Sequence, residues 1–190
     1  MLGAVANDWQ LSGVWTGSTG TAYTAGFSYQ SGGGSVNLTG SSDYPARIRI
    51  VGDPGKGCNS GDPTRQFNAA AFQGPLPGSV GLESGASYLR GCFNSALDLS
   101  IARNIRVGER RNVQFRLDMF NAPNAATITG RNTTVNLASP TAPAAATNLP
   151  YEADGTTPIA SRLAPRTAGF GVATTYQAAR TLQAQVRFSF

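Results

Sequence analysis

Two aspartates, Asp98 and Asp118, are the residues best placed for acid–base chemistry in this sequence. They lie in neighbouring segments that alternate apolar and polar residues, and both occupy polar positions. Two paired carboxylates could act as general acid and general base. Arg106 and Arg116 follow the same alternation and fall on the same face as the aspartates. The arginines favour an ion-pair network on a water-facing surface over catalysis.

Other motifs that carry chemistry are missing or incomplete. The sequence contains no histidine, which removes Ser-His-Asp and Cys-His arrangements and the commonest metal ligand. Residues 77–81 resemble a nucleophile elbow, but Pro77 stands where the first glycine belongs. Residues 55–57 do not complete a phosphate-binding loop, and the aspartates at 53 and 62 lack the spacing of a calcium loop. We therefore expect that the protein is not an enzyme and that it binds no cofactor and no metal.

The two cysteines, Cys58 and Cys92, lie in sequence rich in glycine, asparagine and serine, which is typical of loops. Two cysteines in loops favour a disulfide in an oxidising compartment. That bond would close a loop of roughly 35 residues, worth about 4 kcal/mol in a chain-entropy model. The alternative is a pair of thiols in a reducing compartment.

The composition favours strands and long polar loops over helices. Only 13% of the residues are charged, and the chain has 23 glycines and 11 prolines. The net charge of +5 could indicate nucleic-acid binding. Because the arginines are dispersed and several alternate with apolar residues, we expect no nucleic-acid partner. No apolar run is long enough for a membrane-spanning helix.

Four segments alternate between apolar and polar residues, and we predict long β-strands there, near residues 8–19, 96–107, 112–121 and 176–190. Such a strand has one apolar and one polar face. About ten alternating residues is the length that a tilted strand needs to cross a bilayer. A half-buried strand of a soluble sheet is the alternative for any one segment. In the last segment, the apolar or small positions are Leu182, Ala184, Val186, Phe188 and Phe190.

The connections between these segments are unequal. Residues 21–95 and 122–175 are punctuated by glycine and proline and read as long loops, whereas residues 108–111 form a short turn. Short turns at one end and long loops at the other are typical of outer-membrane barrels. We therefore predict an all-β fold, in which four long antiparallel strands and two long extracellular loops form a transmembrane part of a larger β-barrel. Its polar lumen would hold Asp98, Arg106, Arg116 and Asp118.

Three strings resemble the C-terminal end of TonB-dependent outer-membrane receptors. These are residues 97–108, residues 113–124 with Phe-Asn-Ala-Pro-Asn, and residues 182–190. The closest resemblance is to the Oar-like branch, which carries a carboxypeptidase-regulatory-like domain at its N-terminus. Residues 65–72 also look like that branch. The resemblance implies a bacterial outer-membrane location, a barrel of about 22 strands filled by a plug, and ligand uptake or export powered through TonB. It also implies that the alternating residues ending at Phe190 are read by the barrel-assembly machinery.

The sequence departs from that family in having four candidate strands, no plug, no TonB-contacting segment and no signal peptide. Closed single-chain barrels need about eight strands or more, and open edges do not persist in lipid. The remaining strands and plug of the same barrel, or further copies of this chain, are therefore expected as partners. The other expected partners are outer-membrane lipid, the barrel-assembly machinery, and TonB, which would act through missing N-terminal parts.

Two other functions stay open. Copies of a stand-alone chain could assemble a composite barrel, a surface layer or a fibre. A secreted β-sandwich binding module would instead bury the apolar stripes between two sheets.

Overall fold

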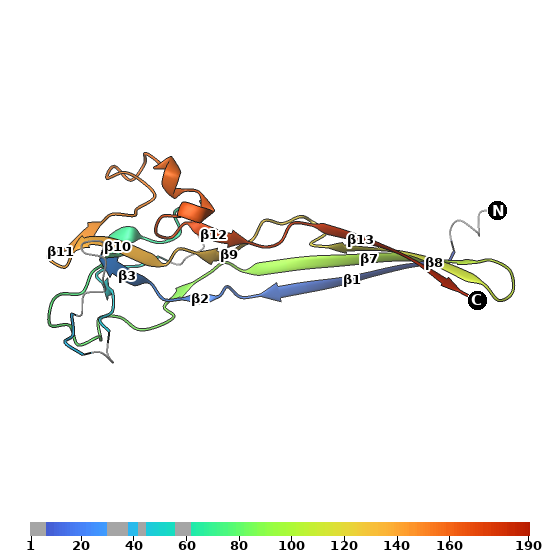
Figure 1. The fold of residues 1–190 in the computed structure, drawn as a ribbon, viewed down its shortest axis with the longest axis horizontal. Helices are drawn as coiled ribbons and strands as arrows, with labels where there is room; N and C mark the ends of the chain where they lie inside the picture. Colours follow the sequence, from blue (N-terminus) through green and yellow to red (C-terminus); the bar gives the residue numbers. More distant parts are fainter. Residues whose placement is uncertain (1–6, 30–37, 42–44, 56–61) are drawn as a thin grey trace. The chain divides into compact units, whose positions relative to one another are not determined.

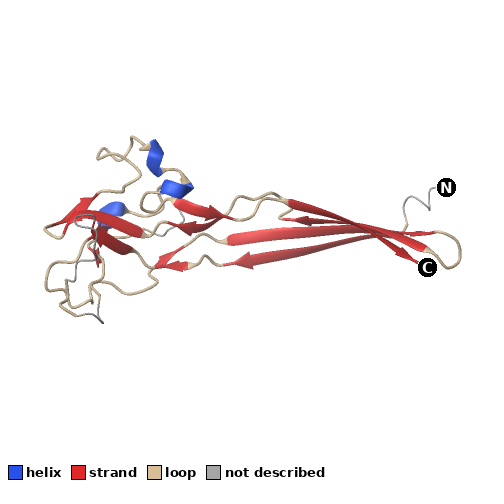
Figure 2. Cartoon of the chain, viewed as in Figure 1, coloured by secondary structure: helices blue, strands red, loops and turns tan. Residues whose placement is uncertain are grey.

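The computed structural model describes residues 7–29, 38–41, 45–55 and 62–190. In this part the chain forms β-strands and three short 3-10 helices, which Figure 2 distinguishes by colour. The chain divides into two compact units. The sheet unit comprises Met1–Ser18, Phe93–Thr127 and Gln177–Phe190, and the loop unit comprises Thr19–Cys92 and Ile128–Tyr176. The all-β prediction is confirmed.

The sheet unit is built on one antiparallel sheet of four long strands in the order β1-β7-β8-β13 (Figure 1). The strands are β1 (Trp9–Ser18), β7 (Asn94–Arg106), β8 (Asn112–Phe120) and β13 (Thr181–Ser189). β1 pairs with β7 without interruption from Trp9 opposite Arg103 to Ser18 opposite Asn94. Unbroken registers keep every second side chain on one face, so each strand contributes one row to each face of the sheet.

The predicted C-terminal strand over 176–190 is shorter in the structure, because β13 begins at Thr181. Its partner β8 ends at Phe120, so residues 177–180 have no ladder in this sheet, and Tyr176 instead ends β12 (Ala173–Tyr176), where it pairs with Ile128. Side chains of the turn after β8 bind this stretch instead. Asn121 donates from Nδ2 to the carbonyl of Ala178 at 2.8 Å, and Asn124 Oδ1 accepts from the Arg180 amide at 3.0 Å. The last strand is therefore confined to the length of β8.

Both long connections leave the sheet at the same end. Ser18 lies opposite Asn94, and Thr181 lies opposite Phe120, so the chain crosses into and out of the loop unit there. At the other end β7 and β8 are joined by a short turn, in which the Val107 amide donates to the Arg111 carbonyl at 2.8 Å. The turn contains a glycine with a φ of +80°, a conformation that strongly favours glycine. The sheet unit thus has the unequal ends that the sequence indicated.

The two segments predicted as irregular loops, 21–95 and 122–175, fold into the loop unit. Its sheets have the orders β11-β10-β3, β12-β9, β2-β6 and β4-β5. The middle strand β10 runs parallel to β3, with Val135 opposite Phe27. Strands of 2 to 6 residues are too short to show alternation in the sequence. They are β2 (Ala22–Tyr23), β3 (Gly26–Tyr29), β4 (Arg49–Ile50), β5 (Phe72–Gln73), β6 (Leu89–Arg90), β9 (Ile128–Arg131), β10 (Thr134–Ser139), β11 (Ala142–Ala146) and β12 (Ala173–Tyr176), with the 3-10 helices η1 (Ala69–Ala71), η2 (Ala160–Arg162) and η3 (Pro165–Thr167).

A hydrophobic core of its own holds the loop unit together. Leu89 and Leu137 are completely buried, and both belong to a cluster that draws on both long segments. Three phenylalanines pack in its centre, with the Phe170 ring 5.5 Å from that of Phe67 and 5.2 Å from that of Phe72. Each fully buried side chain of this size stabilises the folded state by about 1.5–3 kcal/mol relative to exposure. Tertiary packing therefore orders these segments.

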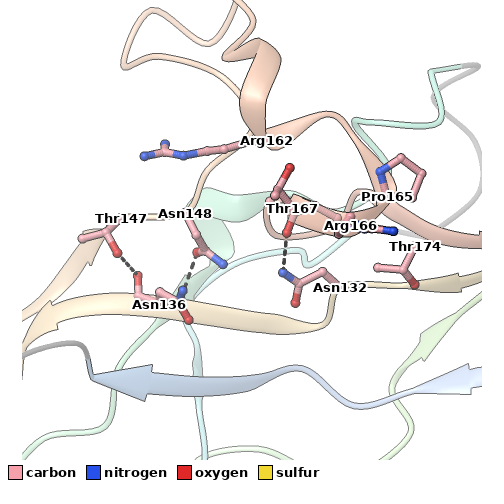
Figure 3. Close-up of a pocket in the computed structure, with 11 residues that line it drawn as sticks. Asn132, Asn136, Thr147, Asn148, Arg162, Pro165, Arg166, Thr167 and Thr174 are labelled. Atoms are coloured by element: carbon pink, nitrogen blue, oxygen red, sulfur yellow. Dashed lines mark hydrogen bonds between the residues drawn. The ribbon is translucent and has the colours of Figure 1, made fainter. Parts of the chain in front are cut away.

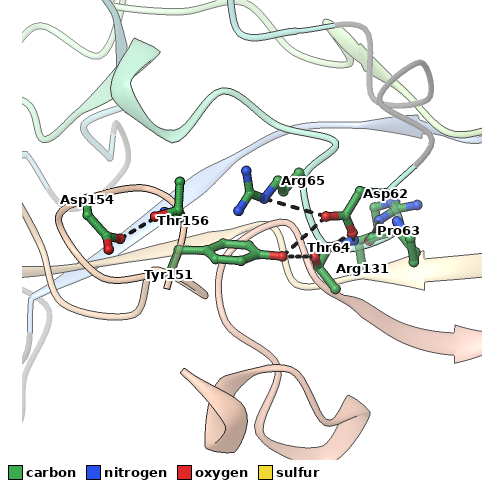
Figure 4. Close-up of polar contacts among 8 residues, drawn as sticks. All are labelled: Asp62, Pro63, Thr64, Arg65, Arg131, Tyr151, Asp154 and Thr156. Carbon is green, nitrogen blue, oxygen red and sulfur yellow. Dashed lines mark hydrogen bonds and ion pairs between the residues drawn. The ribbon is translucent and has the colours of Figure 1, made fainter. Parts of the chain in front are cut away.

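A polar cluster joins the two long segments of the loop unit (Figure 4). The Tyr151 hydroxyl lies 2.6 Å from the Thr64 hydroxyl and donates to Asp62 Oδ2 at 3.2 Å. The Arg65 guanidinium lies over the Tyr151 ring at 3.9 Å, and its Nε is 3.5 Å from Asp62 Oδ2. The hydrogen bond from the Thr64 side chain, more than the Arg65 charge, holds the pKa of Asp62 below its usual value.

We expect acidification to loosen this cluster. Because the pKa of Asp62 is lower in the folded state, the carboxylate stabilises the fold above its unfolded pKa of about 4 and loses that effect as the pH falls through the folded pKa. Hydrogen exchange of residues 62–65, corrected for the intrinsic pH dependence of exchange, should therefore lose protection below about pH 4. In Asp62→Asn the same segment should be less protected at pH 7 and change less on acidification. Equal pH profiles for the unmodified protein and Asp62→Asn would show that the Asp62 carboxylate does not cause the loss of protection.

Candidate functional site

One face of the four-stranded sheet is apolar across all four strands. Its side chains are solvent-exposed, with Leu11 75% and Phe188 70% accessible. Phe115 and Val186, which face each other across β8 and β13, are each about half exposed. A contiguous apolar surface of this kind marks a region that meets lipid or another protein. It is formed by Trp9, Leu11, Trp15, Leu97, Leu99, Ile101, Ile105, Val113, Phe115, Leu117, Met119, Leu182, Ala184, Val186 and Phe188.

The exposure of this face argues against the β-sandwich alternative, which requires the apolar stripes to be buried between two sheets. Four of the five residues expected as the assembly signal, Leu182, Ala184, Val186 and Phe188, lie on the apolar face. Phe190 follows the end of β13 and is fully exposed.

The opposite face of the sheet is mostly polar, with Val14 and Phe120 as its exposed large apolar residues. Arg116 Nε lies 2.9 Å from Asp118 Oδ1, so the structure brings these two predicted residues into an ion pair. Asp98 is on the same face but accepts a hydrogen bond from the Asn121 amide at 2.8 Å, at the turn that follows β8. Arg106 lies near the other end of the sheet and borders a polar hollow of about 340 Å³. The four residues therefore share a face, and one close ion pair forms among them.

Aromatic side chains mark both ends of the apolar face. Trp9 stands opposite Arg103, whose guanidinium carbon lies 5.1 Å from the centre of the indole ring. This contact partly shields the positive charge that Arg103 brings to the apolar face, since a guanidinium is attracted to an aromatic ring. At the other end the Trp15 ring stacks on Phe93, with centroids 6.3 Å apart. Aromatic girdles at both borders of an apolar band are typical of membrane-spanning barrels.

The four-stranded sheet is open at both edges in the part of the chain that the structure describes. β1 pairs there with β7, and β13 pairs with β8, which leaves one side of each outer strand without a ladder. β1 has 10 residues and β13 has 9, so both edges present long rows of backbone donors and acceptors. Backbone groups in lipid must be hydrogen-bonded. Further strands are therefore needed at both edges.

The loop unit contains a polar pocket of about 460 Å³, which sequence reasoning missed (Figure 3). Its arginines come from the η2–η3 segment. Asn136 lies in β10, Asn132 precedes that strand, and Asn148 follows β11. The sequence offers no spacing signal for this site, because its residues are brought together by the folding of the second long segment. The lining consists of Asn132, Asn136, Thr147, Asn148, Arg162, Pro165, Arg166, Thr167, Ala168, Gly169 and Thr174.

One of the two cysteines, Cys92, lies in the described part of the loop unit. Its Sγ lies 3.7 Å from Gln66 Oε1. Cys58 lies outside the described residues, so the predicted disulfide stays a prediction.

Within the described ranges, no group of three or more His, Cys, Asp or Glu side chains could hold a metal ion. The helices described in the structure are all too short or too polar to span a bilayer.

Comparison with protein families supplies the deciding observation. A family model described as an outer membrane beta barrel domain matches residues 1–183. The chain belongs to this family. The protein is accordingly located in the bacterial outer membrane, as the sequence predicted. Comparisons with curated proteins and with solved structures returned no match.

Membership of the outer membrane β-barrel domain family assigns the two faces of the sheet. The apolar face meets the lipid of the outer membrane, and the lipid partner predicted from the sequence is confirmed. The polar face, with Arg116 and Asp118, is the face that a barrel turns inward. The sheet is then one part of an outer membrane barrel, in keeping with its open edges.

Proposed function

We propose that the chain is the C-terminal barrel segment of a TonB-dependent, Oar-like receptor that moves a ligand across the outer membrane and catalyses no reaction. The observation that carries this proposal is the sheet with one lipid-facing and one polar face, whose long connections all leave at one end. The resemblance of residues 113–124 and 182–190 to that receptor family supports the finer assignment.

The proposed partners follow from the same arrangement. Further strands and a plug of the same barrel pair with the edges of β1 and β13, and TonB acts through parts that precede this segment. The barrel-assembly machinery reads the alternating residues of β13 and Phe190. The short turn at 108–111 faces the periplasm and the loop unit faces the cell exterior, an oxidising environment in which Cys58 and Cys92 form a disulfide.

Removal of the terminal aromatic residue tests the assembly role. We expect Phe190→Ser to lower the amount of chain in the outer membrane and to leave it in the periplasm, where it is degraded. The matched control is Ser189→Ala, which changes the neighbouring residue on the polar face. Both are made in the full-length receptor, which contains the remaining strands of the barrel, and the membrane fractions are quantified. Equal insertion of the two variants, or recovery of the unmodified chain as a folded soluble monomer, would contradict the proposal.

A barrel closed by several copies of this chain is the second candidate, favoured by two open edges of nearly equal length. Cysteines introduced by Gly13→Cys on β1 and Ala184→Cys on β13 distinguish the candidates. In a composite barrel these strands pair between copies, so oxidation would produce a ladder of covalent multimers. In a single-chain receptor the same variant would stay monomeric.

A further inference from the structure

We propose that the polar pocket of the loop unit binds a small hydroxylated anion that carries a carboxylate or a phosphate. This anion would be the ligand of the proposed receptor, a role that rests on the proposed function. Its structural basis lies wholly within the second long segment of the loop unit, in residues 132–174.

The charge of the pocket selects an anion. Arg162 and Arg166 line it, and the lining residues that the structure describes include no aspartate or glutamate. Among the described residues, the ion pairs are Arg65 with Asp62 and Arg116 with Asp118, so neither pocket arginine is neutralised by a carboxylate there. The planar fork of a guanidinium matches carboxylate and phosphate groups in two parallel hydrogen bonds. A single guanidinium would therefore give an anion two charge-assisted hydrogen bonds.

The wall opposite the arginines is held rigid before any ligand arrives. The Asn148 side chain accepts through Oδ1 from the backbone amide of Asn136 at 2.9 Å. It also donates from Nδ2 to the Thr134 carbonyl at 2.9 Å. Asn132 donates to the Ala168 carbonyl at 2.7 Å, which attaches the arginine-bearing segment to the strand. Because these side chains are ordered in advance, binding loses less conformational entropy.

The arginine-bearing segment is itself fixed. Arg162 donates from Nη1 to the Leu149 carbonyl at 2.9 Å, and the Gly169 amide donates to the Arg162 carbonyl at 2.8 Å. A Cβ at position 169 would come within 2.7 Å of the Asn148 carbonyl oxygen, so the segment approaches the wall as closely as a glycine permits. The Nη1 bond orients Arg162 and leaves its other guanidinium donors for a ligand.

Hydroxyl and amide groups define the rest of the ligand. Thr174 supplies a hydroxyl and Asn136 supplies a side-chain amide, groups that donate to and accept from sugar-like hydroxyls. The hydroxyls of Thr147 and Thr167 donate to the carbonyls of Asn136 and Ser161, so toward a ligand they act as acceptors. The described lining residues include no aromatic ring, so they offer no surface on which a nucleobase or an aromatic ligand would stack. The volume of about 460 Å³ falls within the range of small-molecule sites. Sugar acids and sugar phosphates combine these features.

Equilibrium binding to membranes that contain the full chain tests this inference with three probes: D-glucuronate, inorganic phosphate and D-glucose. Glucuronate or phosphate should bind about tenfold or more tightly than glucose, because hydrogen bonds to charged groups contribute about 1.5–3 kcal/mol. Arg166→Gln should abolish that preference. The matched control is Arg90→Gln, which removes an exposed arginine of the loop unit outside the pocket and should bind as the unmodified chain does.

The outcomes separate the two proposals. Arg166-dependent binding of glucuronate identifies a carboxylate ligand, and Arg166-dependent binding of phosphate alone identifies a phosphate ligand. Binding of neither anion, equal binding of glucose, or equal loss in both variants would overturn the pocket assignment even with the chain correctly inserted in the membrane. A chain that binds the anion but remains soluble would preserve the pocket and refute the receptor.

Discussion

Leu117→Arg is expected to prevent stable insertion of the sheet into the outer membrane. Leu117 lies in β8, between Ile101 of β7 and Ala184 of β13, in the middle of the lipid-facing surface. An arginine on the lipid face of a barrel costs about 2–4 kcal/mol at the bilayer midplane. This is a large share of a typical folding free energy of about 5–15 kcal/mol. The variant should therefore be depleted from the outer membrane and unfold at lower urea concentration.

The matched control for this prediction is Gln185→Arg. Gln185 lies one residue from Ala184 along β13, but its side chain is on the polar face, opposite Arg116. The control introduces the same side chain at a similar depth on the polar face. Its like-charge contact with Arg116 costs at most about 1 kcal/mol, less than an arginine in lipid. We expect near-normal insertion for the control. Equal loss of insertion in both variants would contradict the assignment of the faces.

Leu137→Ala is expected to unfold the loop unit while the sheet unit stays inserted. Leu137 is completely buried in β10, the middle strand of the three-stranded sheet. Replacing a buried leucine with alanine typically costs about 2–5 kcal/mol, because a cavity remains. The urea dependence of protease cleavage within residues 128–176 should shift to lower concentration, measured on the membrane-inserted chain.

Leu82→Ala serves as the control, since Leu82 belongs to the same unit but is 79% exposed. Its cleavage profile should match that of the unmodified chain. The amount of chain in the outer membrane should be similar for both variants, because neither residue lies in the four-stranded sheet. Loss of insertion in Leu137→Ala would show that the two units do not fold separately.

Removal of the buried charge of Arg131 would be a less informative test of the same unit. Arg131 donates from Nη1 to the carbonyls of Pro63 at 2.8 Å and Gly171 at 3.0 Å, and burial lowers its pKa from the usual value. A substitution there would change a charge, two hydrogen bonds and a volume together. Leu137 isolates the packing contribution.

The sequence by itself determined the four long strands and their two faces. Alternation is a local property: a period of two in residues such as Leu97, Leu99 and Ile101 predicts a strand with one apolar face before any partner is known. The short turn at 108–111 set β7 against β8. The outer-membrane location was implied by the resemblance of residues 97–108, 113–124 and 182–190 to outer-membrane receptors, and strands of about ten alternating residues are long enough to cross a bilayer.

Only the tertiary structure decided how the rest of the chain is used. β13 begins at Thr181 because its partner β8 ends at the opposite residue, Phe120. The alternation of the C-terminal segment alone could not show this, so the predicted strand began too early, at residue 176. The short strands of the loop unit pair residues far apart in sequence, as Phe27 does with Val135. The pocket needs Arg162 and Arg166 to be folded back onto Asn132 and Asn148. Such contacts depend on loop closure and on a shared core, which no periodicity within a few residues encodes.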